Sequence, residues 1–421
     1  MQKKTQILLW MVIAMIISYL PWYNFSAVLK SISAEFHLTS SDTGLIIAAF
    51  QAGYVMVVIF TGWLADRIGP KRVVLYATLL TGIFSTAFVF VAHNLTTVLI
   101  MRMLTGCATG AIYVPGMSLI LNWYTPKESG KALGAYTGAA TAASAGGYFV
   151  ASPIAASYGW RAGMLWTSLP VFIAFFIILC LVDEKPSGKQ AIESIPISNI
   201  TSEMPEEIKR GKSGPAIITT GYMGHMWELY AFWGWLGPFM VANEIASGVS
   251  ASAAVKWGGL MAACIVLVGA PSVFLMGLLA DKIGRTKAII LSSTCSLAAE
   301  FFFGSLIGKS RVAVILLGIW IGFWVVSDSA IYKAGLTDMV SPKKRSTALS
   351  FQSAIGYSMT IIAPIVFGKV LQFYNDSTDP TAMQFWAPAF IMLGLGALLA
   401  PISALILRKI PQAKLMAGGK L

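Results

Sequence analysis

Two ionisable side chains lie three residues apart within an otherwise apolar stretch of the chain. His225 and Glu228 share one face if the stretch is helical, because helix positions i and i+3 lie one above the other. Burial disfavours a charged carboxyl group, whereas a protonated imidazole nearby favours it. These opposing effects can let the pair exchange a proton near neutral pH. The pattern predicts proton coupling with Glu228 as the leading residue; the alternative is a neutral hydrogen-bonded pair that only fixes packing.

Three more charged residues lie in apolar stretches, where each needs a partner, a water-filled cavity or a function. Asp328 and Lys333, with Tyr332 beside them, could form a charge-neutralising pair, although a spacing of five residues aligns them poorly. Alternatively, Asp328 faces a cavity as a substrate or proton site. The Arg102 guanidinium stays protonated, so it must meet a carboxylate, backbone carbonyls or an anionic substrate.

The composition of the chain indicates what must position these residues. Hydrophobic residues make up 57% of the 421 residues and charged residues only 11%, against about 25% charged residues in soluble proteins. A mean hydropathy of +0.73 agrees with a protein solvated mainly by lipid. The net charge of +12 comes in short clusters between apolar stretches, which indicates membrane topology rather than nucleic-acid binding. The four cysteines show no metal-ligand spacing, so we expect no metal and no cofactor.

Segments of roughly 20 mostly apolar residues predict twelve membrane-spanning helices. The expected spans are residues 6–29, 43–64, 73–92, 96–121, 130–152, 162–182, 214–240, 254–280, 287–307, 312–335, 346–367 and 386–407. Placing both termini in the cytoplasm puts most basic loop residues on that side, as the positive-inside rule requires. We therefore expect a multi-pass protein of the cell (inner) membrane. A polar cytoplasmic linker at 183–213 separates a six-helix bundle at 1–182 from a second at 214–421.

A short segment occurs twice in the chain. Residues 62–72 read GWLADRIGPKR and residues 277–287 read GLLADKIGRTK; the two aspartates, Asp66 and Asp281, are 281 − 66 = 215 residues apart. An offset of about half the chain indicates a duplicated membrane module. In each copy an acidic residue ends a helix with basic residues one or two turns away. Such a cluster could latch two helices in one conformation and release them in another.

The expected latch residues are Asp66, Arg67, Arg72, Asp281, Arg285 and Asp338. Asp338 lies at the end of the tenth span, where it could accept a hydrogen bond from Arg285 or from Lys287. Its counterpart in the first half is Asn122, at an offset of 338 − 122 = 216 residues, so we expect the first latch to be weaker. The alternative is that these charges only fix the topology.

The repeated segment resembles the signature loop of the major facilitator superfamily, between its second and third helices. Arg102, Thr105, Gly106 and Gly110 resemble that superfamily's fourth-helix motif. The resemblance implies an all-α membrane protein with twelve transmembrane helices in two pseudo-symmetric six-helix bundles. These would surround a central cavity and alternate between inward-facing and outward-facing states. It implies a transporter and not an enzyme, and it says little about the substrate.

Polar residues on helices that line the cavity in this family are candidate substrate contacts, or else packing contacts between helices. They are Tyr19, Asn24, Gln51, Tyr113, Tyr136, Gln352 and Tyr357. We add them to the candidate substrate and proton sites Arg102, His225, Glu228, Asp328, Tyr332 and Lys333. Glu300 lies in the outer part of the ninth span, a peripheral helix in the family, and we expect it at the membrane interface.

These patterns favour a monomeric, proton-coupled carrier that takes up a small organic anion or another small metabolite. An anion could use Arg102 with Lys333, whereas an amphiphilic cation could face Glu228 and Asp328. The family's drug exporters carry Gly-Pro in the fifth helix where this chain has Ala-Ala at 142–143, which favours uptake. The alternative is a proton-antiport exporter of cationic or amphiphilic compounds. Sodium is a second candidate for the coupling ion, because Asp328 with neighbouring serines offers hard oxygen ligands.

Overall fold

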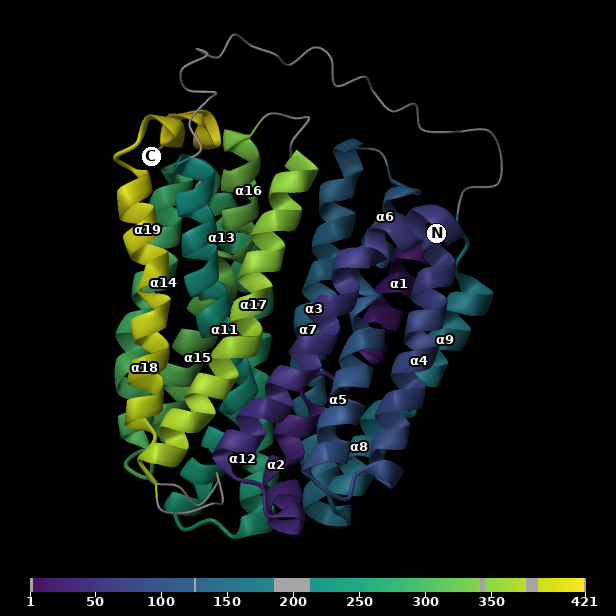
Figure 1. Ribbon diagram of the computed structural model, residues 1–421, viewed down its shortest axis with the longest axis vertical. Coiled ribbons are helices and arrows are strands. Elements are labelled where there is room, and N and C mark those ends of the chain that lie inside the picture. The colour runs from purple at the N-terminus through teal and green to yellow at the C-terminus, as the bar shows by residue number, and fades with distance from the viewer. Residues whose placement is uncertain (1–2, 125, 185–212, 341–344, 376–384, 420–421) are drawn as a thin grey trace.

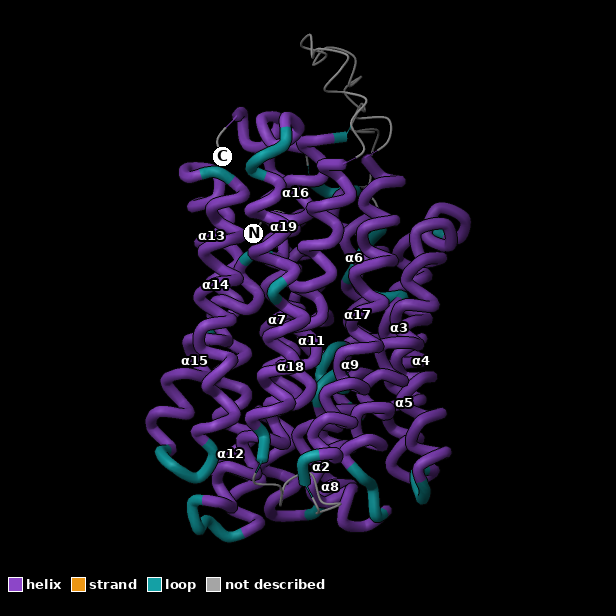
Figure 2. Tube along the Cα trace, turned by 60° about the vertical axis from the view of Figure 1, so that its left-hand side comes forward, coloured by secondary structure: helices purple, strands orange, loops and turns teal. Residues whose placement is uncertain are grey.

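The computed structural model describes residues 3–124, 126–184, 213–340, 345–375 and 385–419, and this part of the chain is helical with no strand. The helices run side by side, and most loops gather at the two ends of the bundle, with short interruptions midway along several helices (Figure 2). Most of the predicted linker, residues 185–212, lies outside the described residues. We call the end of the bundle that this segment joins the linker end, and the opposite end the far end. Both termini lie towards the linker end (Figure 1).

The helices form two groups that stand side by side in Figure 1. The N-terminal group comprises α1 (Lys3–Ser18), α2 (Asn24–Phe36), α3 (Ser40–Ile68), α4 (Pro70–Val91), α5 (Leu95–Gly110), α6 (Tyr113–Leu121), α7 (Pro126–Tyr158), α8 (Trp160–Ser168) and α9 (Pro170–Leu181). The C-terminal group comprises α11 (Ser213–Ala246), α12 (Ala251–Leu267), α13 (Gly269–Ile283), α14 (Arg285–Phe303), η2 (Gly304–Leu306), α15 (Arg311–Ser327), α16 (Ser329–Met339), α17 (Arg345–Phe373), α18 (Ala387–Ala397), α19 (Leu399–Leu407) and η4 (Pro411–Gly419).

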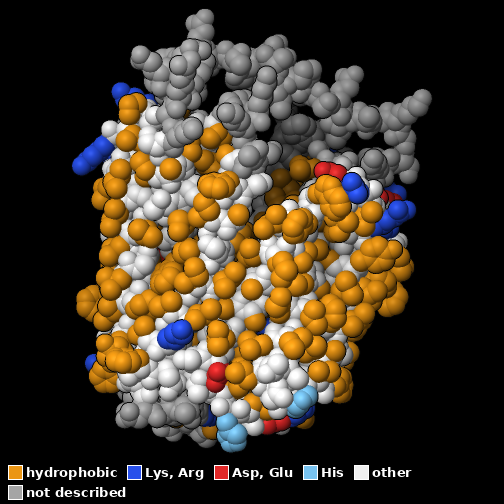
Figure 3. Space-filling model, in the orientation of Figure 1, with side chains coloured by type: hydrophobic (Ala, Val, Ile, Leu, Met, Phe, Trp, Pro, Cys, Tyr) orange, Lys and Arg blue, Asp and Glu red, His pale blue; other side chains and the backbone are white. Residues whose placement is uncertain are grey.

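Nine helical stretches among the described residues are long and apolar enough to cross a membrane by length and composition. They are Ser40–Ile68, Pro70–Val91, Leu95–Leu121, Trp160–Leu181, Ala251–Ile283, Arg285–Leu306, Arg311–Met339, Ala348–Phe373 and Ala387–Leu407. Each coincides with one predicted span. The other three predicted spans coincide with α1 and α2 together, with α7 and with α11. Apolar side chains cover the middle of the visible surface and charged side chains lie mostly towards its ends (Figure 3), as a lipid-facing surface requires.

The duplicated segment forms the same turn in both groups. Gly69, between α3 and α4, has a φ of 89°, and Gly284, between α13 and α14, has a φ of 100°. These are left-handed values that favour glycine. Each glycine ends one helix and precedes the first residue of the next, so a single residue separates the two helices. The repeat in the sequence is therefore a repeat in backbone geometry.

The most extensive contacts between the groups are those of α3 with α17 and of α7 with α12, and α2 also packs on α11. A Cβ atom on Gly44 of α3 would lie 2.5 Å from the carbonyl oxygen of Pro364, so only glycine permits this approach. The Ser40 N–H donates a hydrogen bond to Gln372 Oε1 at 3.1 Å. Ser40 begins α3 at the far end, directly after the turn that follows α2. The two groups are therefore joined closely at the far end.

Candidate functional site

A buried histidine–aspartate pair lies inside the C-terminal group, where α15 ends and α16 begins. His225 of α11 is 2% exposed, and its Nδ1 lies 2.9 Å from Oδ1 of Asp328, which is 3% exposed. The other ring nitrogen, Nε2, lies 2.7 Å from Ser329 Oγ. We expected His225 to pair with Glu228 on its own helix, and that expectation is wrong. The imidazole instead reaches across to the junction residue Asp328, which sits between two helices rather than within one.

Glu228 has a different partner from a different helix. Its carboxyl group is 2% exposed and contacts the Ser296 hydroxyl group on α14. One turn away on α14, Ser292 accepts a hydrogen bond from Ser327 at 2.8 Å, and Ser327 directly precedes Asp328. Buried polar groups of α11, α14 and α15 therefore lie in one region inside the C-terminal group.

Glu300 also belongs to the interior. We expected this residue at the membrane interface, but its side chain is 0% exposed. Neither carboxyl oxygen has a hydrogen-bond partner among the described residues. The expectation failed because α14 turns the face that carries Ser292, Ser296 and Glu300 towards the other helices of its group rather than towards lipid.

Lys333 does not pair with Asp328, which binds His225 instead. Its side chain is exposed to solvent although many protein atoms surround it, and it makes no ion pair or hydrogen bond with the described part of the chain. The neighbouring Tyr332 is buried, and its ring centroid lies 5.6 Å from that of His225. Gln352 of α17 is buried too, and its Nε2 lies 3.5 Å from the Tyr332 carbonyl oxygen. Lys333 is therefore an uncompensated cation close in sequence to a buried acid.

Arg102 binds backbone carbonyl groups at the break in the first span. The chain interrupts its helix between α1 and α2, which leaves backbone carbonyl groups without intrahelical partners. Arg102 donates from Nη1 to the Pro21 carbonyl and from Nη2 to the Trp22 carbonyl, both at 3.0 Å. Its guanidinium also lies 4.4 Å from the ring centroid of Phe50. Of the three partners that we considered for Arg102, the structure shows backbone carbonyls.

Four aromatic rings from both groups lie together midway along the bundle, and we call them the aromatic layer. Trp22 lies 4.8 Å from Tyr54 and 6.3 Å from Tyr230 between ring centroids. Tyr357 lies 5.8 Å from Tyr54 and 6.3 Å from Tyr230. Only Tyr357 was among the candidates from the sequence. For the other three, aromatic type within a predicted span was the only signal.

Three other candidates make contacts within the N-terminal group. Asn24 donates a hydrogen bond to Thr167 Oγ1 at 2.9 Å. Tyr113 stacks on Tyr136 with 5.8 Å between ring centroids, and its hydroxyl group lies 2.8 Å from Thr137 Oγ1. Tyr136 is fully buried, whereas Tyr113 is half-buried. Of these side chains, Tyr113 is the one that solvent reaches.

The two copies of the latch differ at the linker end. In the C-terminal group, Arg285 donates from Nε to Asp338 at 2.7 Å and from Nη1 to Asp281 at 3.3 Å. In the N-terminal group, the described residues show no ion pair for Asp66 or Arg72. Arg67 instead lies over the Trp63 ring, 4.2 Å from its centroid. The geometry agrees with the expected contact between Arg285 and Asp338.

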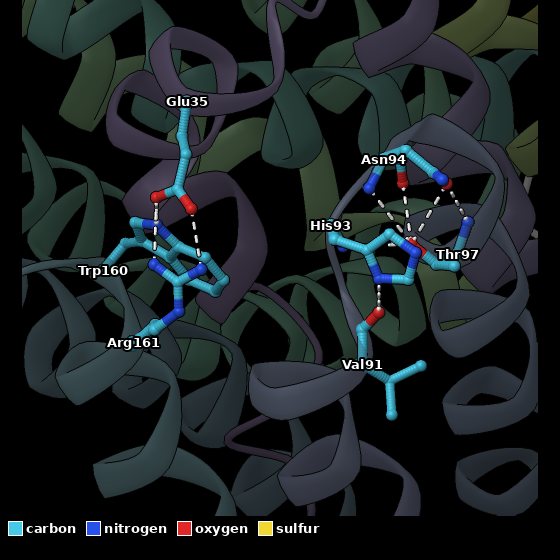
Figure 4. A network of polar contacts seen from close by, with 7 residues as sticks. All are labelled: Glu35, Val91, His93, Asn94, Thr97, Trp160 and Arg161. Carbon is cyan, nitrogen blue, oxygen red and sulfur yellow. Dashed lines mark hydrogen bonds and ion pairs between the residues drawn. The ribbon is translucent and has the colours of Figure 1, made fainter.

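A second polar cluster lies at the far end, and no pattern in the sequence pointed to it. Glu35, near the end of α2, accepts two hydrogen bonds from Arg161 at 3.0 and 2.7 Å and one from the Trp160 indole at 2.7 Å (Figure 4). Arg161 and Trp160 hold the pKa of the Glu35 carboxyl group below its ordinary value, because both donate to the charged form. This cluster joins α2 to α8 within the N-terminal group.

Comparison with known families identifies the class of protein. The family model described as "Major Facilitator Superfamily" matches residues 11–229 and again 218–419. The chain belongs to the Major Facilitator Superfamily. One relative of this superfamily member is the "Hexuronate transporter" of Bacillus subtilis (strain 168), 22% identical over 417 residues, with 96% of this chain and 94% of that protein covered.

Two further matches extend over most of the chain. The "Probable sulfoacetate transporter SauU" of Cupriavidus necator is 23% identical over 408 residues, with 91% of this chain and 89% of that protein covered. A solved bacterial homologue of the human lysosomal transporter Spinster, in an inward-facing and occupied conformation, shares the fold with a TM-score of 0.76 at 16% identity, with 97% of each chain covered. The protein is thus a multi-pass membrane protein and a secondary transporter of a small molecule, not an enzyme. The predicted fold is confirmed.

Proposed function

We propose that this transporter takes up a small organic anion together with protons across the cell membrane. The linker end, with both termini, would face the cytoplasm, as the distribution of basic residues predicts. The proposal depends chiefly on Lys333. Its side chain is exposed to solvent and has no counter-ion among the described residues. It lies five residues from Asp328, which forms the buried pair with His225. An anionic solute could neutralise Lys333, while the buried acids bind the protons.

The position of Lys333 on α16 supports a role in the central cavity. Gly335 of the same helix lies against Ile218 of α11 and Met416 of η4, so that side of α16 faces the interior of the C-terminal group. Residues two apart on a helix point about 200° apart, given 3.6 residues per turn. Lys333 therefore points out of the C-terminal group. We propose that it points into the cavity between the two groups, which would open to the linker end because the groups are joined at the far end.

The named relatives support an anionic substrate. Hexuronate and sulfoacetate are both organic anions, and the proteins named for transporting them match this chain over most of its length. The aromatic layer would form the closed floor beneath the substrate, with the half-buried Tyr230 and Tyr357 presenting ring faces and hydroxyl groups to it. The two latches would then stabilise different states of the transport cycle.

The alternative is a proton-antiport exporter of cationic amphiphiles. The same aromatic layer favours it, because aromatic faces attract cations. An exporter would be indifferent to Lys333 or would be improved by its loss, since a fixed positive charge repels a cationic solute. The two proposals therefore predict different effects of neutralising Lys333: weaker substrate binding for anion uptake, and unchanged or improved transport for cation export.

The test is a binding and uptake assay on the purified transporter in proteoliposomes. Hexuronate, sulfoacetate, neutral sugars and quaternary ammonium compounds would be compared under an imposed proton gradient and, separately, a sodium gradient. We expect an organic anion to accumulate with the proton gradient. In Lys333→Gln its Kd should rise about 10- to 100-fold, because a hydrogen bond to a charged group contributes about 1.5–3 kcal/mol.

Lys309→Gln is the matched control, because Lys309 lies in the far-end turn before α15 and outside the cavity that we propose. Accumulation of quaternary ammonium compounds outside the vesicles, unaffected by Lys333→Gln, would overturn uptake of an anion in favour of export. Accumulation driven by sodium alone would overturn proton coupling.

A further inference from the structure

Glu300 is an ionisable side chain that is buried without a hydrogen-bond partner among the described residues. It is fully buried on α14, one turn before the far end of the helix at Phe303. Neither of its carboxyl oxygens has a partner in the described part of the chain. A bare carboxylate in such a place is strongly disfavoured, so the group must carry a proton or hold a cation in this state.

Glu300 lies in line with the proton-binding groups proposed above. Ser292, Ser296 and Glu300 are spaced by four residues, so they follow one face of α14 with about 6 Å between neighbours at 1.5 Å of rise per residue. Ser296 contacts the Glu228 carboxyl group, and Ser292 binds Ser327 beside Asp328. The stripe on α14 therefore runs from the region of the His225–Asp328 pair, past Glu228, to Glu300.

The titratable group that acts on Glu300 from a neighbouring helix is Glu228 of α11. His225 and Asp328 lie farther along the stripe, in the region of Ser292. The helices α13 and α16 also pack on α14, and their charged residues lie towards the linker end: Asp281, Lys282, Lys333 and Asp338. The helices α15, α18 and α19, which also pack on α14, carry no charged residue between Val312 and Ser327 or between Ala387 and Leu407.

The basic residue at the far-end start of α15 is already paired. Arg311 donates to the Glu244 carboxylate of α11 from both Nε and Nη2. Among the described residues, therefore, no cation forms an ion pair with Glu300, and a proton is the simplest counter-charge.

The far side of Glu300 is closed by aromatic rings. Phe303 packs against Phe232, Phe239 and Phe390 with ring centroids 5.9, 4.6 and 5.2 Å apart. All four side chains are fully buried. Apolar rings therefore lie on this side of Glu300. On its other side, one turn earlier on the same face of α14, lies the buried Ser296, which contacts Glu228.

We propose that Glu300 is a second proton-binding site of the transporter, which exchanges its proton with Glu228 through the Ser296 hydroxyl group. In this step the Glu300 O–H bond breaks and a new O–H bond forms on Ser296 Oγ, while the original Ser296 proton passes to the Glu228 carboxylate. Glu300 becomes charged as Glu228 becomes neutral, so the net charge of the pair is constant. Two carboxyl groups so close are not both ionised, since like charges disfavour one another. The proposal rests on the proton coupling proposed above.

The test compares Glu300→Gln with the wild-type transporter. Glutamine keeps the shape of the side chain and removes the titratable proton. We expect the number of protons carried per substrate, measured from the pH gradient that just halts net flux, to fall by one. Substrate exchange at equal pH on both sides, which needs no net proton movement, should be retained. Thr294→Ala is the matched control, because Thr294 is exposed on the same helix and off the stripe.

A second readout needs no substrate. Infrared difference spectra of the purified protein between two pH values should show a protonated-carboxyl band that disappears in Glu300→Gln and persists in Thr294→Ala. Ser296→Ala should keep that band but slow proton-driven uptake at least tenfold while exchange continues. If Glu300→Gln does not fold, Ser296→Ala and Glu300→Asp replace it in the test. Glu300→Asp should keep the number of protons carried per substrate.

Different failures point to different proposals. If wild-type uptake follows the proton gradient but Glu300→Gln and Ser296→Ala behave as wild type in proton number, rate and pH profile, the second site is refuted and proton coupling stands. If wild-type uptake ignores the proton gradient, proton coupling fails, and the infrared band alone decides whether Glu300 binds a proton. A band that shifts with sodium rather than with pH would make Glu300 a cation ligand and overturn the proposal.

Discussion

The two helix groups share one backbone plan but hold different chemistry at corresponding places. Each group breaks its fourth helix midway, between α5 and α6 in the first and between α15 and α16 in the second. In the second group Asp328 lies at the break, between Ser327 and Ser329. The residue that corresponds to it in the first group is Tyr113, the first residue of α6, because the two are 328 − 113 = 215 residues apart, the offset of the repeat. Tyr113 bonds a threonine, whereas Asp328 pairs with a buried histidine.

The buried charges of the two groups also differ in how they are neutralised. Arg102 of the N-terminal group is held by two backbone carbonyls, which cannot change their protonation. The C-terminal group holds His225, Glu228, Glu300 and Asp328, each of which can gain or lose a proton. This difference is the basis for the proposal that the C-terminal group exchanges protons while the N-terminal group keeps a fixed charge.

The largest effect should come from Asp328→Asn. Asparagine keeps the shape of the side chain but cannot exchange a proton with His225. We expect concentrative uptake under a proton gradient to be abolished and substrate exchange at equal pH to be retained, both measured with labelled substrate in proteoliposomes. Tyr113→Phe, the corresponding change in the N-terminal group, should keep concentrative uptake. Loss of concentrative uptake in both variants would contradict the proposal that only the C-terminal group exchanges protons.

Arg102→Met should destabilise the protein rather than alter its proton coupling. It removes two hydrogen bonds to the carbonyls of Pro21 and Trp22, and hydrogen bonds to charged groups contribute about 1.5–3 kcal/mol each. We expect a clear fall in the apparent unfolding temperature in detergent, with partial recovery in Arg102→Lys. Normal stability combined with lost substrate binding would instead make Arg102 a substrate contact.

The latches should respond unequally in the state described here. Asp338→Asn removes the partly buried contact with Arg285, which we expect to shift the conformational equilibrium by about 1 kcal/mol, the upper range for such ion pairs. Asp66→Asn should shift it by less, because Asp66 has no ion pair among the described residues. Distances between spin labels placed at the linker ends of α4 and α14 would report both shifts. Equal shifts would show that the two latches act together in this state.

The smallest effect should come from the far-end cluster of Glu35 and Arg161. Because both donors favour the charged carboxylate, the folded protein holds the pKa of Glu35 below its ordinary value of 4.5. The stabilisation is therefore complete above pH 4.5 and is lost as the pH falls through the lower, folded-state pKa. The pair is more than one-third exposed, so we expect Glu35→Gln to cost at most about 1 kcal/mol at neutral pH. Thermal unfolding at neutral and acidic pH would measure it, and a larger loss in acid than at neutral pH would contradict the sign.

Much of the fold could be predicted from the sequence because a bilayer permits few solutions. Backbone groups in lipid must be satisfied within helices, so long apolar segments predict spans directly. The repeat at Asp66 and Asp281 indicated the duplicated turn, which the positive φ values of Gly69 and Gly284 bear out. The sequence also placed Asp338 near the basic residues Arg285 and Lys287, and the structure shows that Arg285 is its partner.

The partners of the buried charges could not be predicted in the same way. Lipid and the protein interior are equally apolar. When a helix is apolar on every face, its sequence therefore does not indicate which face points inward. Glu300 was expected at the membrane interface because it lies in the outer part of a span that is peripheral in the family, and the sequence did not show that its face of α14 points inward. His225 and Glu228 do share a helix face, but each side chain reaches a different neighbouring helix, and only the tertiary packing decides which. The carbonyl partners of Arg102 depend on a helix break that hydropathy does not reveal.

The most direct test of proton coupling by the C-terminal group is to follow proton and substrate flux together in proteoliposomes that hold the wild-type transporter. Adding an organic anion such as hexuronate outside, with no gradient imposed and the membrane potential clamped, should make the outside medium more alkaline as the anion enters. We predict that this proton flux is lost in Asp328→Asn, while substrate exchange at equal pH continues. Uptake of the anion by the wild type with no change in outside pH would contradict coupling of transport to protons through the C-terminal group.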